Sequence, residues 1–118
     1  MAYPSRVLAA GNSPLSTISI CGDAANTLTA TGTSTTDALL LSAVNNRVAT
    51  AAASTGVKLG VAEAGAAVVV ANDGASTLAV YPQSGATIDG SGSTTIATGK
   101  RRVFIGISPT VWVSILGA

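Results

Sequence analysis

Residues 68–82 of the chain read VVVANDGASTLAVYP and join two apolar runs through a short polar segment. Residues 68–71 form a continuous apolar run of the kind found in buried β-strands. The Asn-Asp-Gly at residues 72–74 tolerates turn conformations, and residues 78–80 restart an alternating pattern. Pro82 ends the second run because proline cannot donate to a ladder of backbone hydrogen bonds. The stretch therefore predicts a β-hairpin in the core of a β-rich domain.

The segments on either side follow the same pattern. Residues 27–31 alternate threonine with apolar residues, as a half-buried strand does. Residues 101–107 and 111–116 each place branched apolar side chains on one face, and the turn at residues 108–110 predicts a terminal hairpin. Shorter strands are expected at residues 57–59, 86–88 and 94–97. Short strands separated by closely spaced turns are typical of β-sandwiches and β-barrels. We therefore expect an all-β fold with a single small β-sandwich or barrel-like domain.

Residues 37–50 allow two interpretations. A helix could begin with Thr36 or Asp37 as its N-cap, and the leucine spacing nearly suits one. Such a surface helix would have only Asp37 and Arg47 to face water. We therefore favour two strands that meet at residues 45–46, because a hairpin needs no charged face.

The first residues of the chain differ from the rest. The 118 residues suffice for one domain with a core. Prolines and a glycine interrupt residues 1–20, yet apolar side chains are scattered through them. We predict an extended N-terminal arm at residues 1–20 and a β-sandwich or barrel domain at 21–118. The arm packs either on a partner or along its own domain, and the sequence favours neither.

The chain carries little charge. Charged residues make up 9% and the net charge is +1, while hydrophobic residues make up 47%. Little like-charge repulsion keeps copies apart, so this composition suits a subunit of an assembly. A charge of +1 provides no field for nucleic acid or a membrane surface. No apolar run is long enough to span a bilayer or act as a signal peptide, so we expect synthesis in the cytoplasm.

Chemistry-bearing residues are scarce. The chain has no histidine and one cysteine, Cys21, which we interpret as a buried apolar filler. Asp73 and Asp89 each precede a glycine, where an aspartate normally bonds its own backbone in a turn. The glycines at residues 90–92 lack the ending of a phosphate-binding loop. We therefore predict no enzyme activity, no cofactor and no metal site.

Two further features have alternative interpretations. Trp112 is either a core or interface residue, or an exposed platform for a sugar ring. The cluster Lys100, Arg101 and Arg102 is either a solvated strand edge that discourages aggregation, a contact to an acidic partner, or a weak nucleic-acid contact.

A set of turn glycines and core strands resembles small β-rich virion structural proteins of tailed bacteriophages. The resemblance covers roughly residues 50–106 and rests on TGVKL at 55–59, EAG at 63–65, VVVANDG at 68–74, LAVYP at 78–82, SG at 84–85 and TIDG at 87–90. It rests on no reactive group.

The resemblance implies a structural protein of the virion, and our leading hypothesis is a capsid decoration, or cement, protein on the outer surface of the head. Its implied partners are the major capsid protein and itself, as a homotrimer, with no nucleic acid and no membrane. The predicted contacts are Tyr3, Arg6, Val7, Leu8, Leu15 and Ile18 of the arm, with Lys100, Arg101 and Arg102. The alternatives are a tail fibre or baseplate-associated β-domain and a carbohydrate-binding module.

Overall fold

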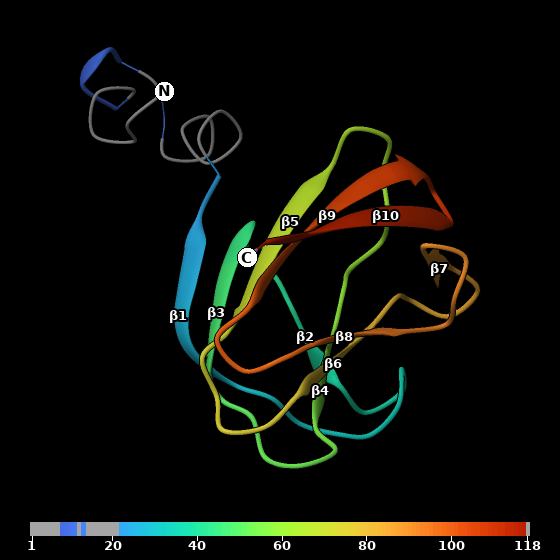
Figure 1. The fold of residues 1–118 in the computed structure, drawn as a ribbon. Helices are drawn as coiled ribbons and strands as arrows, with labels where there is room; N and C mark the ends of the chain where they lie inside the picture. Colours follow the sequence, from blue (N-terminus) through green and yellow to red (C-terminus); the bar gives the residue numbers. More distant parts are fainter. Residues whose placement is uncertain (1–7, 12, 14–21, 118) are drawn as a thin grey trace.

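The computed structural model describes residues 8–11, 13 and 22–117, and its regular elements are ten strands (Figure 1). The strands are β1 (Ala24–Thr29), β2 (Leu39–Leu40), β3 (Asn45–Thr50), β4 (Gly56–Lys58), β5 (Ala67–Asn72), β6 (Leu78–Tyr81), β7 (Thr87–Ile88), β8 (Thr94–Ile96), β9 (Arg101–Ser108) and β10 (Val111–Gly117). They form a six-stranded sheet in the order β1-β3-β5-β9-β10-β7 and a four-stranded sheet in the order β2-β4-β6-β8. The predicted all-β class is confirmed.

The first six strands alternate between the two sheets. β1, β3 and β5 pair in parallel in one sheet, and β2, β4 and β6 pair in parallel in the other. The chain therefore winds through three successive coils of a two-sheet β-solenoid. This corrects the predicted sandwich or barrel, in which strands adjacent in sequence would commonly pair with each other. Here each of the first six strands pairs with a strand that lies one full coil away.

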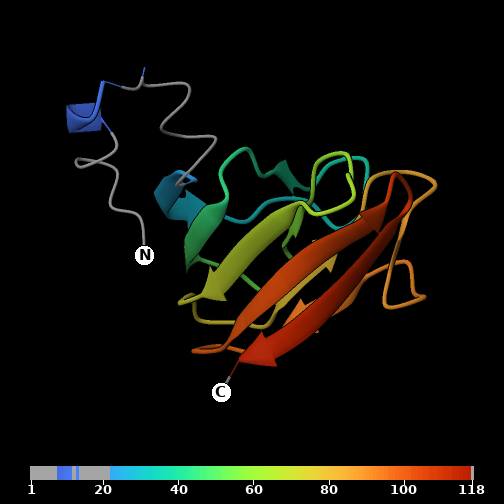
Figure 2. The same cartoon turned by 90° about the horizontal axis from the view of Figure 1, so that it is seen from above.

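The last four strands extend both sheets. β8 adds to the four-stranded sheet antiparallel to β6. β9 and β10 form an antiparallel hairpin that joins the six-stranded sheet beside β5, which confirms the predicted terminal hairpin. β7 then pairs in parallel with β10 at the far edge. Figure 2 shows β5, β9 and β10 side by side in this sheet.

Residues 68–82 cross between the sheets. β5 belongs to the six-stranded sheet and β6 to the four-stranded one, so the predicted hairpin is wrong although both strands exist. Both strands bury side chains in the same interior, so the chain bends from one sheet to the other. Residues 37–50 behave similarly. The strand interpretation is confirmed over the helix, but residues 45–46, predicted as the turn, belong to β3, and β2 and β3 lie in different sheets and do not pair.

Asn72 holds the bend after β5. Its side chain is fully buried, and its Nδ2 donates to the carbonyl oxygens of Ser76 at 2.9 Å and Ile96 at 2.8 Å. Its Oδ1 accepts the N–H of Gly74 at 3.0 Å. A Cβ at Gly74 would collide with the backbone of Ala51 in the preceding coil. The predicted turn residues thus include a buried polar clamp that connects β5, the bend and β8.

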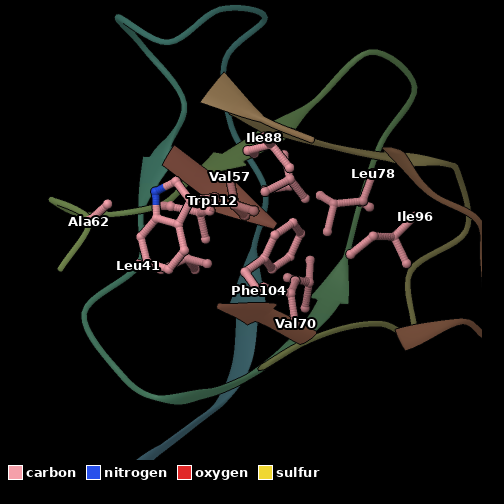
Figure 3. Packing of buried hydrophobic residues seen from close by; sticks show 14 residues of the cluster. Leu41, Val57, Ala62, Val70, Leu78, Ile88, Ile96, Phe104 and Trp112 are labelled. Atoms are coloured by element: carbon pink, nitrogen blue, oxygen red, sulfur yellow. The ribbon is translucent and has the colours of Figure 1, made fainter. Parts of the chain in front are cut away.

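The core lies between the two sheets (Figure 3). Its largest buried side chains are Trp112, Phe104, Leu59, Leu78, Ile88 and Ile96. Trp112 is 1% exposed, which confirms the core interpretation and excludes the predicted alternative of an exposed sugar platform. Phe104 and Trp112 come from the terminal hairpin, so this hairpin covers the interior of the coils.

Candidate interaction surface

The side of the six-stranded sheet that faces away from the core is largely aliphatic, and we call it the outer face. Phe104 and Trp112 point into the core, and because side chains alternate along a strand, the residues directly before and after each of them point to this side. Cross-strand pairing arranges them in rows. One row holds Ala67, Ile105 and Val113, and the next holds Asn45, Val69, Val103 and Ile115.

These side chains are not part of the buried core cluster. Ile107 is 54% exposed and Ile115 is 62% exposed, while Val69, Val103 and Ile105 are half-buried by their neighbours on the sheet. Single exposed aliphatic residues are common on protein surfaces, but adjoining ones on three strands form a patch. Contiguous patches of this kind mark sites of association.

A set of polar side chains, linked by hydrogen bonds and ion pairs, borders the patch. Arg47 donates from Nε to Asp73 Oδ2 at 2.7 Å and from a terminal nitrogen to Asn26 Oδ1 at 3.0 Å. Arg101 approaches Asp73 at 3.9 Å from β9. The two arginine side chains remain about half exposed, at 48% and 55%. Both therefore stay accessible while Asp73 offsets part of their charge.

A hollow of about 450 Å³ adjoins this border. Its lining comes from β1, β3 and β5, the start of the bend that follows and the first residue of β9: Ala24, Ala25, Asn26, Asn45, Asn46, Arg47, Val69, Ala71, Asp73 and Arg101. Asn46 is 3% exposed, and its Oδ1 has no hydrogen-bond partner. The hollow shares Val69 with the aliphatic patch, so the two form one continuous surface.

The structure separates the predicted basic cluster. Lys100 is exposed, Arg101 points to the outer face, and Arg102 points to the opposite side, where it donates to Ser114 Oγ at 2.7 Å. Ser114 in turn donates to Asp89. The predicted strand edge is wrong, because β9 lies between β5 and β10. Alternation along the strand is why adjacent cations do not share one surface.

The two aspartates predicted to bond their own turns contact other elements. Asp73 pairs with Arg47, and Asp89 accepts the backbone N–H of Ser114 at 2.9 Å. Asp89 does adopt a turn conformation, with φ of 51°. Its carboxylate therefore ties the loop after β7 to β10 rather than to itself.

Most of the predicted arm contacts lie outside the described residues. This applies to Tyr3, Arg6, Val7, Leu15 and Ile18, and also to Cys21. Leu8 is described and is 44% exposed. Its contribution to a contact stays a prediction.

The described residues contain no group of three or more His, Cys, Asp or Glu placed to hold a metal ion. They also contain no helix that is long and apolar enough to cross a membrane. Asp37 is the residue with a shifted pKa: hydrogen bonds from the Ser34 hydroxyl, the Ser34 N–H and the Thr33 N–H lower it from the ordinary value of 3.8. This carboxylate is exposed and stabilises a turn before β2.

Sequence reasoning missed the outer face as a site, although the signal was present. Strand β10 begins Val111, Trp112, Val113, and such a strand is apolar on both faces rather than alternating. A strand of this kind is typically covered on both sides. The core covers Trp112, whereas Ile115, on the opposite face of the strand, is 62% exposed.

Comparison with protein-family models, curated proteins and solved structures finds no match to this chain.

Proposed function

We propose that this protein is a structural component of a phage virion, a capsid decoration protein that binds the outer head surface and stabilises contacts between major capsid proteins. The observation that supports this best is the unpartnered aliphatic outer face with its polar border, which suits a subunit that packs against a neighbouring subunit in an assembly. The exposed aliphatic side chains of this surface suit association, and the proposed role requires no catalytic step. The sequence resemblance to phage virion proteins is the reason for proposing that this assembly is a virion.

The energetics suit a cement role. Fully burying a Val or Ile side chain is worth about 1.5–3 kcal/mol. The exposed remainder of Ile115, at 62%, is therefore worth about 1–2 kcal/mol when a neighbouring subunit covers it. Several such side chains give a modest affinity for each copy. A subunit that binds only the assembled shell stabilises it by mass action, and this gain repeats at every site.

A tail component remains the second candidate, because the same face would serve a fibre or baseplate. A carbohydrate-binding module has less support. Among the described aromatic residues, Phe104 and Trp112 are buried, and Tyr81 is half-buried with its hydroxyl donating to Thr33 O at 2.9 Å. No exposed aromatic ring in this part of the chain offers a platform for a sugar.

The test is the location and copy number of the protein in particles. Particles from the strain that carries the gene are purified, separated into heads and tails, and the chain is quantified by mass spectrometry against the major capsid protein. We expect hundreds of copies in the head fraction, and heads without the gene should rupture at a lower temperature. A few copies in the tail fraction would favour the second candidate, and absence from particles would overturn the virion proposal.

A further inference from the structure

The two halves of the outer face differ in side-chain size. Away from the polar border, where each half has one arginine (Arg101 and Arg47), the half on β9 and β10 carries Val103, Ile105, Val113 and Ile115, whereas the half on β3 and β5 carries Asn45, Val69, Ala67 and Ala71. The hollow of about 450 Å³ lies on the second half, over β1, β3 and β5. One half of the surface is therefore raised and the other is recessed.

The raised and recessed halves share the same rows. Ile115 pairs with Val103, Val103 pairs with Val69, and Val69 pairs with Asn45, so these residues lie at one level along the strands. If two copies are related by a rotation axis parallel to the strands, each residue keeps its level along the strands. This rotation would bring Ile115 of one copy over Asn45 and the hollow of another.

The geometry points to a second copy of this chain as the occupant of the outer face, with the β9–β10 half of each copy packed on the β3–β5 half of its neighbour. This names the partner of the surface on which the proposed function rests. Within the contact, Ile105 lies over Ala67 and Val103 lies over Val69. A large side chain thus meets a small one in the first pair, and two side chains of equal size meet in the second.

The polar border fits the same arrangement. Arg101 lies in the row of Ala71, next to Asp73 at the end of β5. In the contact, Arg101 of one copy comes close to Ala71 and Asp73 of its neighbour, so an ion pair can form across the rim. A border with both signs suits a copy of itself better than an acidic partner, because Asp73 already engages both arginines.

Other occupants and other modes of pairing fit less well. The outer face has no Trp, Tyr or Lys among the described residues, which a lipid surface would favour. Edge-to-edge pairing is obstructed, because β1 carries a register shift at Thr27, whose φ is 60°. The opposite edge strand, β7, has only two residues. Copies therefore meet face to face.

The size of the face sets the expected affinity. Without the two-residue β7, the sheet has five strands: β1, β3, β5, β9 and β10. At about 4.8 Å apart and about 20 Å long, they give a face of roughly 480 Å². Two such faces bury about 1,000 Å², near the lower limit for a specific interface. The whole width must therefore be used, hollow included, and association should depend on protein concentration.

Engineered disulfides test the register of the contact. In a Cys21→Ser background, the chain carries Asn45→Cys together with Ile115→Cys and is oxidised at tens of micromolar. The two positions lie three strand spacings apart in one sheet, about 14 Å. They cannot bridge within one chain, because a disulfide requires Cα atoms within about 7 Å. We expect closed species of two or three chains on a non-reducing gel.

The controls are each single variant alone and Asn45→Cys with Leu40→Cys, which lies on the other sheet and is 58% exposed. These should stay uncrosslinked. Cross-linking of Ile115→Cys alone would show β10 against β10 and overturn the inference, as would a monomer that never cross-links. The number of chains in the cross-linked species of the double variant gives the symmetry of the oligomer. Three chains would match the expected homotrimer, and two would show a two-fold pair.

The outcome separates this inference from the proposed function. A chain that is abundant in heads yet never cross-links between positions 45 and 115 keeps the decoration role and removes the self-contact. A chain that cross-links as expected but is absent from particles keeps the self-contact and removes the decoration role.

Discussion

Replacing Asn72 tests the bend that makes this chain a solenoid. In Asn72→Leu the side chain keeps its branch at Cγ and loses all three of its hydrogen bonds. The carbonyls of Ser76 and Ile96 then lose a donor, and the N–H of Gly74 loses its acceptor. All three groups belong to backbone that connects β5 to β6 and β8.

The magnitude follows from these three groups. A buried polar group left without a partner costs about 1–3 kcal/mol. Relaxation and water entry lower the sum, because Ser76 is partly exposed, so we expect a loss of about 3–5 kcal/mol in the free energy of unfolding. The midpoint temperature of a domain this size should fall by roughly 12–25 °C.

The assay is urea unfolding followed by the fluorescence of Trp112, the single tryptophan, which is buried in the core. Asn46→Leu is the matched control. Asn46 is also buried and donates to Ala43 O at 2.8 Å and Val69 O at 3.3 Å, but its Oδ1 has no partner. Its replacement should cost less because it removes one buried group that is already unsatisfied. A loss at Asn72 below about 1 kcal/mol, or below that at Asn46, would refute the reasoning.

Asn72→Asp adds a pH signature to the same experiment. The carboxylate can still accept the N–H of Gly74, but it faces the carbonyl oxygens of Ser76 and Ile96 without a donor. Burial raises the pKa of such a carboxyl, so protonation favours the folded state. The variant should be least stable at neutral pH and should recover toward the native protein as pH falls through the raised pKa. A variant with no such recovery would contradict the buried donor role.

Three further outcomes are expected. Gly106→Ala should lower the free energy of unfolding by about 1–3 kcal/mol, because its Cβ would collide with the carbonyl oxygen of Glu63, whereas Gly92→Ala, with open space around it, should change little. For Asp37, NMR titration of the carboxyl carbon should give a pKa below 3.8, and Ser34→Ala should raise it. Because the folded pKa is the lower one, its stabilisation exists above 3.8 and disappears as pH falls through the folded value; a titration at or above 3.8 in the native protein would contradict this. Removing residues 1–15 should leave the strands folded and abolish binding to heads, and full occupancy by the truncated chain would show that the arm makes no contact.

Most strands could be predicted from the sequence, but of their pairing only the terminal β9–β10 hairpin could. Alternation and apolar runs located β4, β5 and β9 closely, because these patterns report which residues are buried. They do not report which sheet covers them. A hairpin and a bend between two sheets bury the same side chains of β5 and β6, so residues 68–82 fit both.

The coils also escaped detection because their lengths differ. Leu39, Val57 and Val80 are partners in successive coils, yet they are 18 and then 23 residues apart in sequence (39 to 57, 57 to 80). A repeat is recognised by a fixed period. The pairing absorbs the difference in loops such as residues 59–66, so the structural repeat leaves no periodic signal.

The candidate surface could be predicted only in part. Low charge indicated a chain that associates, and Arg101 was among the predicted contacts. The outer face itself required the register, because Val69, Val103 and Ile115 are far apart in sequence and meet only through β5, β9 and β10. Composition predicted association with a neighbour, whereas the strand pairing gives the location of the proposed contact.

The edges of the six-stranded sheet bear on the kind of assembly that this chain can form. An open, regular edge would let copies add strands without limit, as fibrils do. Here the bulged β1 and the two-residue β7 blunt both edges, and the apolar residues lie on the face instead. A raised half and a recessed half on one face can be satisfied by a closed ring of two or three copies. The distribution of apolar side chains thus favours a finite oligomer, which is what a subunit repeated over a shell requires.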